Sequence, residues 1–153
     1  MITIKQQLNK IGLQLPALNQ PAANYVLGVQ VGNLIFISGQ TPKLNGTLRY
    51  KGKVGEQLTA EDGYAAARLC ALNCLAAIDE MVGLDQVAQI VRVTGYVNSA
   101  QDFVDQSKVI NGASDLLVEL FSERGKHARS AIGAYTLPGD AACEVELIVA
   151  IKN

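Results

Sequence analysis

The spacing of hydrophobic residues changes along this chain, and its helical stretches stand out first. Apolar residues that recur three and four positions apart are typical of a helix with one buried face. Thr59 followed by Asp62 fits a capping box at the start of the longest such stretch, and Gly83 fits its end. The pattern predicts three helices: residues 3–13, Thr59–Val82, and a segment that follows Asn111 and ends at Gly125.

Alternation of apolar and polar residues marks the strands. Gly32-Asn33 lies between two β-rich segments and favours a compact hairpin, and Pro138-Gly139 favours a second tight turn. Residues 41–58 carry several glycines, so we expect a loop there. The predicted strands are residues 25–31, 34–38, 87–97, 130–137 and 142–151, the last two paired as a hairpin.

The order of these elements is an N-terminal helix, then ββ, α, β, α, ββ, which favours an α+β domain. One mixed sheet covered on one face by two helices is the economical two-layer arrangement. Ile148 and Ala150 make the strand face opposite Cys143 partly apolar, so we expect another subunit to cover it. We expect residues 1–20 to form an extra helix and an extended lead-in, and residues 21–153 to form a single domain.

Composition narrows the class of protein. The net charge is −1 and no basic cluster is present, so nucleic-acid binding through phosphate neutralisation is not expected. The chain has no apolar run long enough for a membrane span and no signal-peptide pattern at its N-terminus, which predicts a cytoplasmic protein. Cys70, Cys74 and Cys143 are expected to be buried free thiols. With His127 as the single histidine and no Cys-x-x-Cys pair, a metal site has almost no ligands, and no cofactor is expected.

Arg129, at the entrance of a predicted strand, is the most informative polar residue. A guanidinium that is even half buried needs an anionic partner, and its planar donors suit a carboxylate held by two hydrogen bonds. If the Pro138-Gly139 turn has two residues, Arg129 lies opposite Ile148 and shares a face of the sheet with Glu144. The two would then stand four residues apart, about 13 Å. A common pocket would therefore be easier to build from two chains.

Each polar candidate also has an ordinary structural interpretation. Arg129 could form a surface salt bridge, and Glu144 could lie on a solvated strand face. Ser38 could cap a turn, Tyr25 could be a half-buried strand aromatic, and Asn111 before a glycine could be a helix N-cap. The residue types alone do not decide between these roles and a binding site.

Five segments carry a resemblance to a known family: residues 24–29, residues 32–40 with their Ser-Gly-Gln end, Ala128-Arg129-Ser130, Leu137-Pro138 and Cys143-Glu144-Val145-Glu146. Together they resemble the RidA family, also named YjgF and, by an older label, endoribonuclease L-PSP. The resemblance covers roughly residues 22–152. Residues 111–116 and 126–130 are similar to a longer, less characterised branch of that family.

The resemblance implies a chorismate-mutase-like fold and a homotrimer with pockets between subunits. It also implies hydrolysis of reactive 2-imino acids, formed from enamines such as 2-aminoacrylate, to 2-keto acids and ammonia. Arg129 matches the family's substrate-carboxylate arginine, and Glu144 matches its water-positioning glutamate. Tyr25 and Ser38 match pocket positions, and Gly39 could allow close approach of a ligand.

Two departures from the family pattern bear on the substrate. The cysteine that the family often carries two residues after the arginine is Ala131 here. The family's helix-start asparagine aligns with Asn111 if an insertion follows and with Ser114 if none does, so both are candidate pocket residues. The function stays open between an imine deaminase and a small-carboxylate-binding or regulatory trimer without catalysis. The slight negative charge and the single histidine disfavour a ribonuclease.

Overall fold

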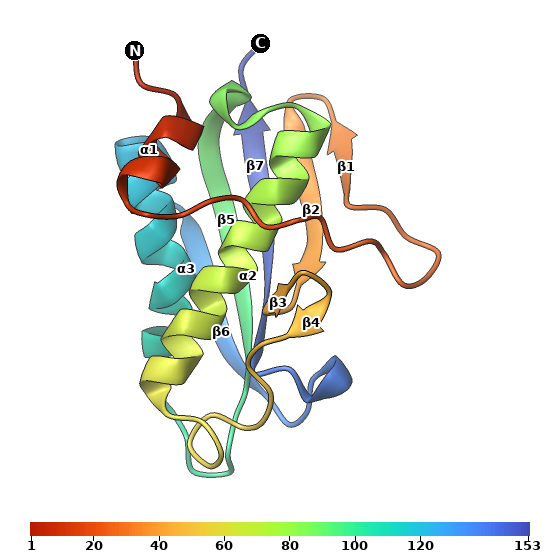
Figure 1. Cartoon of the computed structure of the whole chain (residues 1–153), viewed down its shortest axis with the longest axis vertical. Helices are drawn as coiled ribbons and strands as arrows, with labels where there is room; N and C mark the ends of the chain where they lie inside the picture. Colours follow the sequence, from red (N-terminus) through yellow and green to blue (C-terminus); the bar gives the residue numbers. More distant parts are fainter.

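A computed structural model describes all 153 residues, and a mixed five-stranded sheet with the order β1-β2-β7-β5-β6 forms its centre. The helices α2 and α3 lie side by side on one face of this sheet (Figure 1). This arrangement confirms the predicted α+β two-layer fold with an additional short N-terminal helix. The sheet consists of β1 (Gly28–Val31), β2 (Leu34–Gln40), β5 (Val87–Asn98), β6 (Ala128–Ala134) and β7 (Cys143–Ile151), and the α-helices are α1 (Ile4–Lys10), α2 (Ala60–Met81) and α3 (Gln106–Phe121).

The predicted start of the long helix α2 is confirmed in detail. The Thr59 hydroxyl accepts a hydrogen bond from the backbone of Asp62, and the Asp62 carboxylate accepts one from the backbone of Thr59. The buried face of α2 is rich in alanine and cysteine, and these small side chains let it lie close to both the sheet and α3. Burial there raises the thiol pKa of Cys70 and Cys74, so neither is a ready nucleophile.

The start predicted for α3 is wrong, because the helix begins at Gln106 and Asn111 lies inside it rather than at its N-cap. Val109 and Ile110 are fully buried and extend the apolar face one turn earlier. Gly112, which follows the predicted N-cap Asn111, is where α3 touches α2. A β-carbon at Gly112 would lie 2.8 Å from the carbonyl carbon of Tyr64, so only glycine allows this contact.

The N-terminal hairpin is confirmed, with β1 paired to β2 across Gly32-Asn33 and Gly32 at a positive φ of 61°. The predicted C-terminal hairpin is wrong. β5 lies between β6 and β7, parallel to β6 and antiparallel to β7. Parallel strands need a crossover, and α3 supplies it between β5 and β6. Pro138–Asp140 forms a 3₁₀ turn (η3) instead of a two-residue hairpin turn.

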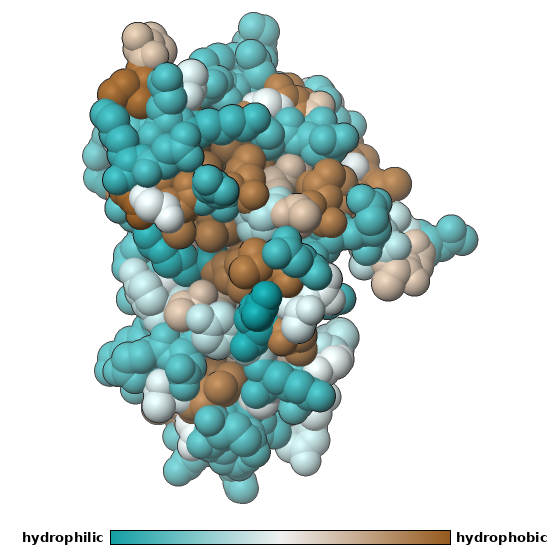
Figure 2. Space-filling view, viewed as in Figure 1, coloured by the Kyte–Doolittle hydropathy of each residue, from teal (hydrophilic) through white to brown (hydrophobic).

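Two shorter features complete the fold. The expected loop at residues 41–58 contains a small hairpin of β3 (Lys43–Leu44) and β4 (Thr47–Leu48). After α1 the chain crosses α2 as an extended segment, residues 11–27, before it reaches β1 (Figure 1). We call this segment the strap. Ile4 and Leu8 of α1 are buried in the core. The helix side of the molecule shows apolar side chains gathered where the strap crosses (Figure 2), so the N-terminal residues cover part of the helical layer.

The face of the sheet away from the helices is uncovered and partly apolar. Phe36 of β2 pairs with Ile148 of β7, and their side chains are on this face. Phe36 is 44% exposed, and Ile132 of the edge strand β6 is 48% exposed. Val29 and Val31 of β1 add to the same exposed apolar surface. Apolar area of this kind on a sheet is typical of an interaction surface.

Candidate functional site

Arg129 lies on the edge strand β6, where it pairs with Val93 of β5, which pairs in turn with Leu147 of β7. Val93 and Leu147 are buried under the helices, so Arg129 projects on the helix side of the sheet edge. Its Nη1 donates hydrogen bonds to Asn111 Oδ1 at 2.8 Å and to Ser114 Oγ at 3.2 Å. Asn111 and Ser114 are one turn apart on α3, so both of the alternative pocket residues contact the arginine.

This half-buried guanidinium has no anionic partner within the chain. All four salt bridges of the structure involve other residues. Nε and Nη2 of Arg129 make no hydrogen bond, which leaves two donors of the planar fork available. The arrangement can therefore hold a carboxylate by two parallel hydrogen bonds.

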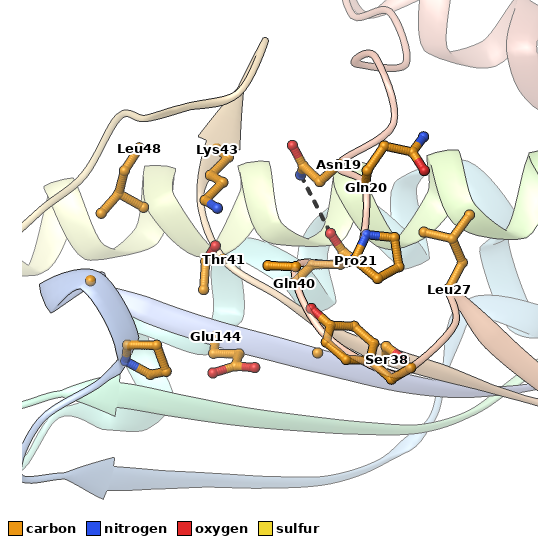
Figure 3. A pocket seen from close by; sticks show the side chains of 15 residues that line it. Asn19, Gln20, Pro21, Leu27, Ser38, Gln40, Thr41, Lys43, Leu48 and Glu144 are labelled. Carbon is orange, nitrogen blue, oxygen red and sulfur yellow. Dashed lines mark hydrogen bonds between the residues drawn. The ribbon is translucent and has the colours of Figure 1, made fainter.

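A second set of candidates lines a cavity of about 280 Å³ beside β2 and β7, away from the edge strand β6 that carries Arg129. Glu144 of β7 borders this cavity together with Tyr25, Ser38 and Gly39, and the strap contributes Asn19 and neighbouring residues (Figure 3). The Ser38 hydroxyl donates to the carbonyl of Val26 at 2.6 Å, which ties the strap to β2. Tyr25 stands at the edge of the cavity and is 53% exposed.

A bulge in β2 brings Gly39 against the Glu144 carboxylate. The pairing register between β2 and β7 shifts between Ile37 and Gln40, as it does where one strand carries an extra residue. A β-carbon on Gly39 would lie 3.1 Å from Cδ of Glu144 and closer still to Oε1. We expected Gly39 to allow close approach of a ligand, whereas in the structure its missing side chain makes room for the Glu144 carboxylate.

Glu144 is half-buried and forms no salt bridge. Burial raises the pKa of its carboxyl group, and the nearby charge of Glu146 raises this pKa further. Glu146 in turn accepts a hydrogen bond from the Tyr96 hydroxyl at 2.9 Å. A carboxylate with a raised pKa at the wall of a cavity is suited to accept a proton.

The expectation that Arg129 and Glu144 share a face of the sheet is wrong. Glu144 pairs with Tyr96 on the open face, whereas Arg129 pairs with Val93 on the helix face. The expected register assumed that β6 pairs directly with β7, but β5 lies between them and Arg129 is not opposite Ile148. One chain therefore holds the candidate residues in two separate groups: Arg129 with Asn111 and Ser114, and Glu144 with Tyr25, Ser38 and Gly39.

The sequence pattern did not assign a site role to His127, which stands two residues before Arg129. Its Nε2 lies 2.9 Å from Ser114 Oγ, and its Nδ1 lies 2.6 Å from the carbonyl oxygen of Gly125. Burial lowers the pKa of His127, and the charge of Arg129 lowers it further. The signal available in the sequence was the position of the single histidine, two residues before Arg129.

The chain shows no cluster of three or more His, Cys, Asp or Glu side chains arranged to hold a metal ion. Its three cysteines are free and buried, as expected. None of its helices combines the length and the apolar character needed to cross a membrane.

Comparison with known proteins places this geometry in context. Residues 5–151 match the family described as "YjgF/chorismate_mutase-like, putative endoribonuclease". Protein TCP17 of Trypanosoma cruzi is 41% identical over 98% of this chain and 95% of its own length. The 2-iminobutanoate/2-iminopropanoate deaminase of Escherichia coli K12 is 35% identical over 85% of this chain and 91% of its own length.

Among solved structures, Atu1372 of Agrobacterium tumefaciens, a protein of unknown function, is 37% identical and has a TM-score of 0.92 over 97% of this chain and 92% of its own. The YjgF protein of Escherichia coli is 31% identical, with a TM-score of 0.58 over 91% of this chain and 98% of its own. The match to the family model and the sequence identities agree with the sheet topology and with the motifs around Arg129 and Glu144. The chain belongs to the YjgF/RidA family.

Proposed function

We propose that this protein hydrolyses reactive 2-imino acids to 2-keto acids and ammonia in a pocket built from two subunits. The observation that carries the proposal is the separation of two incomplete half-sites. Arg129 is a half-buried cation without an anion, and Glu144 is a half-buried carboxylate without a cation. Each half-site supplies the group that the other lacks.

A homotrimer is the assembly that we propose to bring the half-sites together. The uncovered sheet face carries Phe36, Ile132 and Ile148, whose burial against another copy would stabilise the assembly at roughly 25 cal/mol per Å² of apolar area. Arg129 lies on the edge strand β6, where a neighbouring subunit can reach it. In a closed ring, the edge of each subunit would face the cavity of the next.

The chemistry needs few groups, because the carbon of an imine is already electrophilic. Arg129 would hold the substrate carboxylate through Nε and Nη2, and this grip would orient the imine carbon towards the partner subunit's Glu144. Glu144 would accept a proton from water as the water oxygen bonds to that carbon. The proton then passes to the nitrogen, and the resulting carbinolamine collapses to the ketone and releases ammonia. Positioning and proton transfer together account for such a step without a covalent enzyme intermediate.

The family's frequent cysteine is not needed in this scheme. Ala131 occupies that position on β6 and packs against the core. The deaminases among the relatives are 29–35% identical to this chain, which supports a shared reaction class. The alternative is a trimer that binds small carboxylates without catalysis, since the same arginine would serve a sensor of keto acids.

Ammonia release from 2-iminopropionate, generated in situ from alanine by an amino-acid oxidase, tests the proposal. Glu144→Gln should lower kcat by roughly 10²–10⁴-fold, the range expected for a lost general base. It should leave the affinity for pyruvate nearly unchanged, because Arg129 holds the carboxylate. An unchanged rate would refute the role of Glu144. Pyruvate binding without any hydrolysis by the wild type would favour the binding-protein alternative.

A further inference from the structure

We propose that His127 is a positioning residue, which acts through the Ser114 hydroxyl to fix the guanidinium of Arg129 for a carboxylate. The inference deepens the function proposed above and rests on Arg129 being its carboxylate site. Three hydrogen bonds form a continuous chain from the backbone of Gly125 through His127 and Ser114 to Arg129. Neither the resemblance to the family nor the comparisons assign a role to this histidine.

The first link fixes the protonation of the imidazole. The carbonyl oxygen of Gly125 can only accept a hydrogen bond, so Nδ1 of His127 must carry the proton. In the neutral ring Nε2 then has a lone pair and accepts the proton of the Ser114 hydroxyl. With its proton directed to His127, the Ser114 oxygen presents a lone pair to Nη1 of Arg129.

The second link fixes the arginine. Nη1 is held between Ser114 and Asn111 Oδ1, while Nε and Nη2 remain free on the adjacent edge of the fork. A guanidinium on a flexible stem loses rotamer entropy when it is fixed in one orientation. Holding Nη1 on two acceptors reduces the part of this entropy that is lost when a carboxylate binds.

The backbone that orients His127 is itself tightly placed. Gly125 ends the 3₁₀ turn η2 (Ser122–Gly125) and lies against the last turns of α3. A β-carbon there would lie 2.7 Å from the carbonyl carbon of Leu117 and 2.8 Å from Cα of Val118. Only glycine allows the backbone to lie this close to α3, and this is the position from which its carbonyl accepts from His127.

The charge facing the imidazole is that of Arg129, and the other nearby charges on α3 and η2 are engaged elsewhere. Asp115 accepts from the Tyr64 hydroxyl, and Glu119 pairs with Arg68 of α2. The charged residues just before His127 in the chain also have partners: Lys126 pairs with Glu123, and Arg124 donates to the carbonyl of Val87. Burial lowers the pKa of His127 from its usual value, the hydrogen bond to the Gly125 carbonyl offsets part of this, and the positive charge of Arg129 lowers the pKa further.

The tautomer can be measured directly because His127 is the only histidine. Long-range ¹H–¹⁵N NMR spectra of the full-length protein at neutral pH should show a protonated Nδ1 and a bare Nε2. In Ser114→Ala the Nε2 signal should move, because its hydrogen-bond partner is gone. A ring protonated at Nε2 in the wild type would overturn the inference whatever the enzymatic activity proves to be.

Two substitutions distinguish the contributions of Nδ1 and Nε2 of His127. His127→Asn keeps an amide near the Nδ1 position but cannot reach Ser114, and pyruvate affinity measured by calorimetry should fall roughly three- to tenfold. His127→Gln places an amide oxygen near the Nε2 position and should restore most of this affinity. His127→Asn combined with Ser114→Ala should cost little more than either change alone. Lys126→Gln, a charge change one residue away, should leave the affinity unchanged.

The pH dependence gives an independent check with a defined sign. As the pH falls through the lowered pKa of His127, Nε2 becomes a donor and no longer accepts from Ser114. Pyruvate affinity of the wild type should therefore weaken only at a pH below the ordinary pKa of histidine, whereas that of His127→Gln should not. Equal pH profiles in the two proteins, or wild-type affinity in His127→Asn, would overturn the inference.

These outcomes are distinct from those of the proposed function. If the wild type binds pyruvate with the predicted His127 dependence but releases no ammonia from the imine, the deaminase proposal fails and this inference stands. If hydrolysis occurs and the His127 variants bind normally, only this inference fails. A wild type that neither binds pyruvate nor releases ammonia from the imine overturns both.

Discussion

Substitution of Gly39 by alanine tests the proposed role of Glu144 without replacing Glu144 itself. The added methyl group would lie 3.1 Å from Cδ and 3.2 Å from Cγ of Glu144, and nearer still to Oε1. The φ of Gly39 is not positive, so alanine can adopt the backbone conformation of the bulge. The carboxylate is the flexible end of a side chain, and we expect it to move while β2 and β7 stay paired.

The expected sizes of the two effects differ. To restore ordinary van der Waals contact the carboxylate must move by roughly 1 Å. A misplacement of that size at a reacting group can lower the rate by about 10²-fold. The free energy of unfolding should fall by only about 1 kcal/mol, the low end of the cost of overpacking, which lowers Tm by roughly 2–4 °C in a chain of this length.

The assay is kcat on 2-iminopropionate together with thermal unfolding of the same samples. In the Glu144→Gln background, Gly39→Ala should cause little further loss, because the group that it displaces is already inactive. Gly133→Ala is a matched control, since the nearest neighbours of its added carbon would be the side-chain ends of Gln106 and Ser99. Wild-type kcat in Gly39→Ala, or an equal loss in both backgrounds, would refute the proposed contact between Gly39 and a catalytic Glu144.

Three further changes address binding, assembly and packing. Arg129→Lys should lose most pyruvate affinity in calorimetry, because a point charge cannot reproduce the two-point grip of a guanidinium; wild-type affinity would leave only a generic electrostatic role. Sedimentation should give about three times 16.3 kDa for the wild type, and Phe36→Lys on the open face should shift this towards the monomer. Gly112→Ala should lower the free energy of unfolding by roughly 1–3 kcal/mol in denaturant titration. Its added carbon would lie 2.8 Å from a backbone carbon of Tyr64, and the backbones of two packed helices cannot move apart without losing other contacts. An unchanged midpoint would contradict the helix contact.

Glu144 also makes a prediction for the pH dependence of stability. Its pKa is raised in the folded state, so the folded protein binds this proton more tightly than the unfolded chain does. The group therefore stabilises the fold below its ordinary pKa and destabilises it once it ionises at higher pH. Glu144→Gln should raise Tm near neutral pH, and the gain should shrink as the pH falls towards 4. A constant gain across this range would show that the charge is not its cause.

The sequence by itself determined the features that depend on residues close together in the chain. The Thr59–Asp62 cap, the Gly32-Asn33 turn and the apolar face of α2 all involve neighbours within a few positions, and each formed as predicted. The family motifs also located Arg129 and Glu144 as the charged residues to examine. Local patterns of this kind fix the element types and their order, which is why the two-layer α+β fold was predicted correctly.

Tertiary structure decided how distant segments pair and which face each side chain takes. The insertion of β5 between β6 and β7 depends on contacts far apart in sequence, and no local turn signal encodes it. That insertion placed Arg129 and Glu144 on opposite faces of the sheet. Likewise, Asn111 was predicted as a helix N-cap but lies inside α3. The hydrogen bond of His127 to Ser114 exists only because α3 lies beside the strand entrance. Periodicity describes one element at a time, whereas a binding site is formed where several elements meet.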